Sequence, residues 1–153
     1  MPPATPDRAC THLALRRLTR LVSRHYDAHL AHCGLKTTQY SLLATVTRSG
    51  PVGLGDLARL LSLDASTLTR NLRPLVKAKL LTIDAGADGR SRQVTATPAG
   101  ASLRALARSH WRRAQASLDK TLGAEQAVSL HHIVDHCYRL LAGGETAESV
   151  SER

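Results

Sequence analysis

The chain has 153 residues and a formal net charge of +9, with 21 Lys and Arg residues against 12 Asp and Glu residues. Hydrophobic residues make up 42% of it, which is enough for a packed core and excludes a wholly disordered chain. Aromatic residues are only 3% and Phe is absent, so the core must be built from Leu, Ala and Val, a composition that favours helices. This length fits a single domain, residues 1–153.

The sequence predicts a cytoplasmic protein that needs no cofactor. No charge-free apolar run approaches the roughly 18 residues of a membrane span, and the first residues lack the apolar segment of a secretory signal. Three cysteines, Cys10, Cys33 and Cys137, are too few and too scattered for a disulfide framework, so we expect free thiols.

The first half of the chain is predicted to be helical. Apolar residues recur every three or four positions over Cys10–His32, which indicates a long amphipathic helix that Gly34 ends. Thr37 or Thr38 can cap a second helix, which stops before a Ser-Gly-Pro sequence. A short third helix is expected from Leu54.

A fourth helix is the most informative element. Asp64 is its expected N-cap, and its buried side is formed by Leu68, Leu72, Leu75 and Val76. Pro74 conflicts with this pattern, so we expect a kink or a displaced last turn. Its outward face carries hydroxyl and cationic side chains without an acid: Ser66, Thr67, Thr69, Arg70, Arg73 and Lys77. Such groups bind phosphates or base edges.

A hairpin and two long helices complete the prediction. Short strands are expected at residues 80–83 and 93–97, around a tip rich in Gly and Asp. Thr97-Pro98 reads as the start of a long helix that stops near Gly123. A sixth helix follows at residues 124–142, and the polar tail after it is expected to fray. In the fifth helix, Arg104, Arg108 and Arg112 form one stripe, which we interpret as a solvated face.

These elements predict a mainly α protein with a small β-wing, that is, a winged helix-turn-helix. The sequence LGDLARLLSLDASTLTRNLRPLVKAKLL, followed by DGRSRQVTATPAG, resembles the MarR family of bacterial transcription regulators. The similarity extends upstream through YDAHLAHCGLKTTQYSLL and covers about residues 10–142. The chain departs from the usual family pattern at Lys79, where Gly is common, at Ile83 and at Ala96.

The resemblance implies a sequence-specific, ligand-responsive repressor that binds double-stranded DNA as a homodimer on a palindromic operator. The DNA-binding lobe would span about residues 35–97, with helical dimerisation arms at about 8–33 and 98–142. Major-groove contacts would come from Ser66, Thr67, Thr69, Arg70 and Arg73. Arg90 and Arg92 would enter the minor groove or bind phosphates, and Asp88 would pair with Arg90 and orient the wing.

The family also implies a small aromatic or organic-acid effector, bound between the arms and the lobe. In this chain the corresponding residues would be His12, Arg16, Tyr40 and Trp111. The sequence identifies neither the effector nor the operator, nor does it distinguish a repressor from an activator.

Histidine and cysteine clusters suggest a metal- or redox-responsive regulator of the same fold. His25, His29, His32 and Cys33 can share one helix face, and His131, His132, His136 and Cys137 form a similar group. Imidazole and thiolate suit zinc or copper. The pattern lacks the paired Cys-x-x-Cys of a strong metal motif, so we interpret these residues as polar, partly buried residues of a dimer seam and predict no metal. Cys10 offers a thiol sensor or a plain structural thiol.

Two other classes of function fit less well. A small His/Cys-dependent enzyme lacks any motif that sets a nucleophile against a base, so no enzyme is predicted. A DNA-packaging protein without sequence preference would explain the charge but not the compact basic helix and hairpin.

Overall fold

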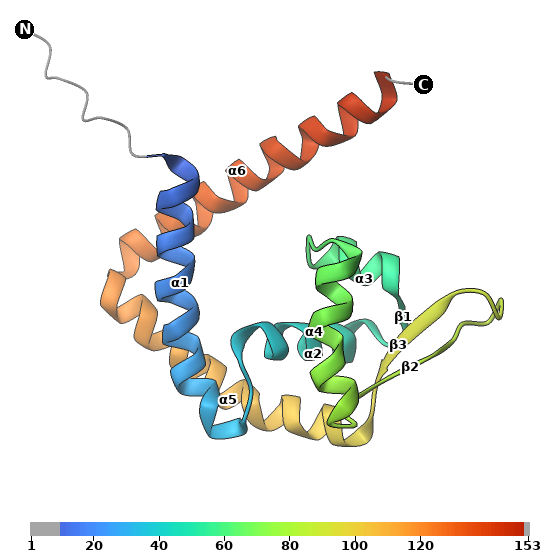
Figure 1. Ribbon diagram of the computed structural model, residues 1–153. Coiled ribbons are helices and arrows are strands. Elements are labelled where there is room, and N and C mark those ends of the chain that lie inside the picture. The colour runs from blue at the N-terminus through green and yellow to red at the C-terminus, as the bar shows by residue number, and fades with distance from the viewer. Residues whose placement is uncertain (1–9, 152–153) are drawn as a thin grey trace, which may run out of the picture. The chain divides into compact units, whose positions relative to one another are not determined.

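The computed structural model describes residues 10–151, with side chains up to residue 143. The chain forms two compact units, residues 1–114 and 115–153. Figure 1 shows the elements in chain order: α1 Thr11–Leu30, a 3-10 turn Ala31–Cys33, α2 Thr37–Ser49, β1 Val52–Gly53, α3 Leu54–Leu60, α4 Ala65–Lys77, β2 Leu81–Ala85, β3 Arg92–Ala96, α5 Pro98–Leu122 and α6 Ala124–Ser151. The predicted class, mainly helical with a small β-wing, is confirmed.

The junction between α1 and α2 corrects one predicted helix cap. Gly34 ends the helical segment in the left-handed conformation, at φ 68°, as the sequence predicted. Neither Thr37 nor Thr38 caps α2, because the helix already begins at Thr37. Instead, Oδ1 of Asp27 in α1 accepts a hydrogen bond from Thr37 N at 2.6 Å. This cap comes from another helix, so no local pattern could have indicated it.

A three-stranded antiparallel sheet, in the order β1-β3-β2, forms the wing. Strands β2 and β3 pair in register from Leu81↔Ala96 to Ala85↔Arg92. The sequence did not predict β1, which has only two residues and pairs Val52 with Val94. In Figure 1 the β2–β3 hairpin extends away from the helices of the lobe.

The core of the first unit lies where α2, α3 and α4 meet the sheet. Among the side chains of these elements, the best buried are at most 2% exposed: Leu42, Leu43, Val46, Leu57, Leu68, Leu72, Leu75, Leu81 and Val94. Each such side chain contributes about 1.5–3 kcal/mol by its burial. Val76, predicted to be buried with the leucines of α4, is only half-buried.

Thr97 and Gly100 connect the wing to α5. The Thr97 hydroxyl accepts a hydrogen bond from Gly100 N at 3.0 Å, which is the expected N-cap, and donates to the carbonyl oxygen of Lys79 at 2.8 Å. A Cβ at Gly100 would collide with the carbonyl oxygen of Leu80. Gly100 is therefore required for the close packing of α5 against the turn between α4 and β2.

The second unit begins within α5, which ends at Leu122 before Gly123 at φ 83°. The helix α6 runs to Ser151, past Gly143-Gly144, so the predicted end at Ala142 was wrong. The tail expected to fray is helical as far as Ser151, and its last two residues lie outside the described residues. A glycine inside a helix costs only about 1 kcal/mol relative to alanine, and no proline follows to stop the helix. None of the described helices is long and apolar enough to cross a membrane.

Candidate nucleic-acid interface

The outward face of α4 carries the side chains that the sequence assigned to DNA. Because Leu68, Leu72 and Leu75 face the core, the opposite side of the helix faces solvent. Four of the predicted contacts are exposed there and a fifth is half-buried; the exposed residues are Ser66, Thr69, Arg70 and Arg73, and the half-buried one is Thr67.

Asp64 organises the first turn of α4. Its Oδ1 accepts hydrogen bonds from Thr67 N at 2.8 Å and from the Ser66 hydroxyl at 2.7 Å, and its Oδ2 accepts from the Thr67 hydroxyl at 2.7 Å. These donors, first the two hydroxyls and then the backbone N–H, hold the pKa of Asp64 far below its usual range. The predicted N-cap is confirmed, and the carboxylate stays ionised at neutral pH.

The cations of α4 are available for a ligand. Arg70 and Arg73 are exposed, and within the described residues neither guanidinium has a protein partner. The expected disruption at Pro74 is small, since α4 continues as one helix to Lys77 and Ala78 N donates to the Pro74 carbonyl oxygen at 3.0 Å. Arg73 therefore keeps its place on the outward face.

The hairpin tip presents Arg90 and Arg92, both exposed. Asp88 does not pair with the guanidinium of Arg90 as predicted: its Oδ1 accepts from Ser91 Oγ at 2.6 Å, Ser91 N at 2.8 Å and Arg90 N at 3.1 Å. These donors, the Ser91 hydroxyl above all, lower the pKa of Asp88. Asp88 thus shapes the backbone of the turn and leaves the Arg90 side chain free to contact a ligand.

A shallow hollow of about 430 Å³ lies between α4 and β2. Its floor is apolar and its edge carries Arg73 and Lys77; the remaining lining residues are Thr69, Leu72, Val76 and Ile83. The helix and the wing therefore form one continuous surface of mixed apolar and cationic character.

A second hollow, of about 310 Å³, brings together two of the four predicted effector residues. Tyr40 and Trp111 stack with ring centroids 6.2 Å apart and an interplanar angle of 20°. His12 and Arg16 do not line this hollow; both are exposed on α1. The sequence reasoning missed its cationic lining residues, Arg48, Arg104 and Arg108.

Arg104 corrects the interpretation of the arginine stripe on α5. Arg108 and Arg112 are exposed as expected, but Arg104 is half-buried, and its covered Nε has no hydrogen-bond partner in the described part of the chain. The four-residue spacing to Arg108 was visible in the sequence, but only the fold shows that these arginines lie beside Trp111.

The histidines of the first cluster make contacts within the protein. His25 Nε2 lies 2.8 Å from the carbonyl oxygen of Ala114 and thereby links α1 to α5. The rings of His25 and His29 are 5.2 Å apart, and His32 stacks on His110 at 5.5 Å. Cys33 is a free, half-buried thiol.

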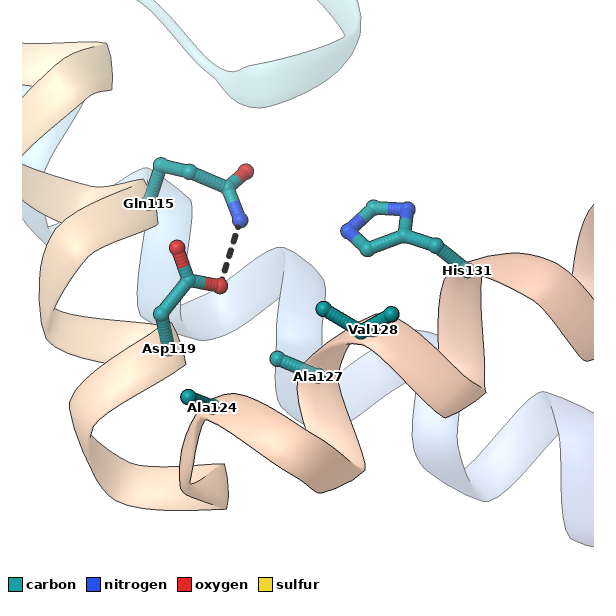
Figure 2. Close-up of a pocket in the computed structure, with 6 residues that line it drawn as sticks. All are labelled: Gln115, Asp119, Ala124, Ala127, Val128 and His131. Carbon is teal, nitrogen blue, oxygen red and sulfur yellow. Dashed lines mark hydrogen bonds between the residues drawn. The ribbon is translucent and has the colours of Figure 1, made fainter.

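The second cluster lies on α6. Figure 2 shows a pocket of about 240 Å³ in which His131 faces Gln115 and Asp119, whose side chains share a hydrogen bond of 2.9 Å. His132, His136 and Cys137 are exposed. Across the part of the chain with described side chains, no three His, Cys, Asp or Glu residues are placed to hold a metal ion.

Residues 34–91 match a family model described as the MarR family. A transcriptional regulator of M. tuberculosis, MosR, solved in complex with DNA, is 28% identical, with 84% of this chain and 98% of that chain covered at a TM-score of 0.69. A second MosR structure is 25% identical over 95% of this chain and 99% of that chain, with a TM-score of 0.72.

More distant structures share the fold. A cysteine-to-serine variant of MarR from E. coli, in complex with operator DNA, is 21% identical and covers 83% of this chain and 95% of that chain, with a TM-score of 0.72. No match was found among curated protein sequences.

Proposed function

We propose that this chain is a MarR-family winged-helix transcriptional regulator that represses by binding a palindromic operator as a homodimer; its residues 34–91 match the model of that family. The solved relatives with DNA, MosR at 28% identity and the E. coli MarR variant, support this proposal. Proteins of this family are transcriptional regulators and not enzymes.

The observation that carries the proposal is the shared surface of α4 and the wing. The outward face of α4 presents Arg70 and Arg73, whose guanidinium groups have no partner among the described residues, and the wing tip presents Arg90. An α-helix fits the major groove, where Arg binds guanine O6 and N7 through two parallel donors. The net charge of +9 attracts the phosphate backbone without regard to sequence.

A homodimer explains the operator symmetry. Two copies related by a two-fold axis place their recognition helices in successive major grooves about 34 Å apart. Exposed apolar side chains on each of the helices α1 and α6 are available for such pairing: Leu15 and Leu21 on α1, and Ile133 and Leu141 on α6.

Alanine substitutions of Arg73 and Arg90 test the assignment. If Arg73 contacts bases, Arg73→Ala costs about 1–3 kcal/mol on an operator and relaxes preference at a defined position. Arg90→Ala removes a contact to the minor groove or backbone, so it weakens operator and scrambled duplexes by similar factors and lowers the salt slope by about one. Binding is measured on both duplexes over a salt series, with the operator taken from selection among randomised duplexes.

Arg59→Ala is the matched control. Arg59 lies on α3 and its guanidinium is held by Asp56 at 2.7 Å, so its loss should leave sequence preference unchanged. If Arg90→Ala binds both duplexes as wild type does, the wing does not contact DNA. If wild type enriches no sequence, the proposed function fails.

We also propose that an aromatic carboxylate binds in the hollow between α2 and α5. Its ring would contact Trp111, which stacks with Tyr40, and its carboxylate would bind Arg104, whose covered Nε has no partner. Calorimetric titration with benzoate should show saturable binding that Arg104→Gln weakens at least about tenfold, the range of a charged hydrogen bond. Arg112 is an exposed arginine of the same helix, and Arg112→Gln is the control, which should bind benzoate as tightly as wild type does. If Arg104→Gln also binds benzoate as tightly as wild type does, this site is excluded.

A further inference from the structure

The hydroxyl groups at the start of α4 all donate their protons within the protein. Ser66 and Thr67 donate to the carboxylate of Asp64, both at 2.7 Å. Thr69 donates to the carbonyl oxygen of Ala65 at 2.8 Å. An ionised carboxylate and a carbonyl can only accept, so the direction of each of these bonds is fixed.

This direction determines what the hydroxyls can bind. A hydroxyl has one proton and two acceptor lone pairs, so a hydroxyl that already donates can only accept from a further partner. In the major groove the proton donors are the amino groups at adenine N6 and cytosine N4, whereas guanine O6 and N7, thymine O4 and the phosphate oxygens only accept.

We propose that Asp64 is a positioning residue that makes Ser66 and Thr67 acceptors for the exocyclic amino group of adenine or cytosine. This inference rests on the proposed function, in which α4 enters the major groove. On the DNA strand that faces these hydroxyls, adenine and cytosine are accepted, and guanine and thymine are disfavoured.

Phosphate binding by the same hydroxyls is the weaker alternative. To donate to a phosphate, Ser66 or Thr67 must first release Asp64, so one hydrogen bond to an anion is exchanged for another and little is gained. Accepting from a base amino group adds a hydrogen bond and breaks none. The unpartnered guanidinium groups of Arg70 and Arg73 remain for guanine and phosphate.

The same network explains why an acid is tolerated on a surface that faces DNA. Asp64 is exposed, and an unpartnered carboxylate there would repel phosphates. Its charge is instead balanced by the backbone N–H of Thr67, by two hydroxyl protons and by the positive end of the α4 dipole.

Asp64→Asn gives a directional test. The amide oxygen of Asn can replace Oδ1 as acceptor for Thr67 N and Ser66 Oγ, so the helix cap is retained. Its NH₂ replaces Oδ2 and donates toward Thr67 Oγ, which turns the Thr67 proton outward.

Base preference is measured by selecting the bound sequences from duplexes randomised across the operator. Wild type should enrich adenine or cytosine at the positions read by Ser66 and Thr67. Asp64→Asn should shift the base preference at the operator position contacted by Thr67 toward guanine or thymine by about two- to tenfold, the effect of one neutral hydrogen bond. The base preference at the position contacted by Ser66 and the melting temperature should stay nearly unchanged. Ser66→Ala and Thr67→Val locate the two positions, because each should abolish the preference at one of them.

Asp56→Asn, at the first turn of α3, is the matched control and should change no base preference. The inference is overturned if wild type enriches a sequence but Asp64→Asn leaves the Thr67 position unchanged, or if guanine or thymine is preferred there. It is also overturned if Ser66→Ala and Thr67→Val weaken all duplexes equally, which is the result expected of phosphate contacts. Selection of no sequence by wild type would instead refute the proposed function and, with it, this inference.

Discussion

The winged lobe and the long terminal helices α1 and α6 contain the same types of apolar residue, but the lobe buries them and the terminal helices expose them. In the lobe, Leu57, Leu72 and Leu81 are at most 1% exposed. On α1 and α6, Leu15 and Leu141 are 54% and 75% exposed. The lobe therefore completes its core within one chain, whereas each terminal helix leaves apolar side chains exposed that a second copy would cover.

This difference in exposure means that the two regions are stabilised by different contacts, within one chain in the lobe and between two chains at the terminal helices. Burial of leucine in the lobe contributes to folding at any protein concentration. Contacts of α1 and α6 with a second copy contribute only as far as the chain dimerises, so their effect rises with concentration. Substitutions in the two regions should consequently be distinguishable by the concentration dependence of unfolding.

The largest expected effect comes from placing a charge on the exposed face of α6. Leu141→Glu buries a carboxylate in the dimer seam of each copy, and we expect the dimer dissociation constant to rise on the order of a hundredfold. Analytical ultracentrifugation over a range of concentrations measures the change.

Leu60→Glu provides the control for this comparison. Leu60 lies on α3 in the lobe and is 57% exposed, so the same substitution should leave sedimentation unchanged. If Leu141→Glu sediments as wild type does, the exposed face of α6 is not the dimer seam and the comparison fails.

The sequence predicted the lobe better than the terminal helices because its signals are local. The four-residue spacing of Leu68 and Leu72 and the N-cap Asp64 determine α4 without reference to the rest of the chain. Gly143 predicted a helix end that does not occur, since a glycine in a helix is a modest local cost and not a stop.

The parts of the site that the sequence missed depend on contacts between distant segments. The two-residue strand β1 is defined only by its pairing with β3, and Asp27 caps α2 from another helix. Arg104 had the spacing of a solvated stripe, and its place beside the Tyr40–Trp111 stack follows from the packing of α5 against α2. Hydroxyl and guanidinium residues on α4 were predictable as a set, but their hydrogen-bond directions were not.

A smaller effect is expected from relief of backbone strain in the lobe. Lys79 has a φ of 58°, which is left-handed backbone that glycine adopts without strain. This conformation costs a non-glycine residue about 1–2 kcal/mol, part of which glycine loses again through its more flexible unfolded chain. Lys79→Gly should therefore raise the free energy of unfolding by about 0.5–1 kcal/mol.

Urea unfolding at a fixed protein concentration measures this gain, and Lys79→Ala is the control. Alanine keeps the Cβ and with it the strain, so it should give no stabilisation. Because the strain lies in the lobe, Lys79→Gly should leave the dimer dissociation constant unchanged. Equal stability of the glycine and alanine variants would show that the strain is negligible.

The smallest expected effect lies at the wing tip and depends on pH. Asp88 accepts hydrogen bonds from Ser91 Oγ, Ser91 N and Arg90 N, which lower its pKa below the ordinary value of an aspartate, about 3.9. A carboxyl with a depressed pKa stabilises the fold above its unfolded pKa and loses that contribution as pH falls through the folded pKa. The turn should thus be held throughout neutral pH and open only below about pH 4.

Carboxyl NMR titration and the exchange protection of the Ser91 amide measure this pH dependence. Ser91→Ala removes the largest cause and should raise the pKa of Asp88 toward its ordinary value, whereas Ser109→Ala, whose hydroxyl bonds only within α5, should not. An unchanged titration of Asp88 in Ser91→Ala would mean that the hydroxyl does not hold the turn, and the wing tip would then be ordered by its strands alone.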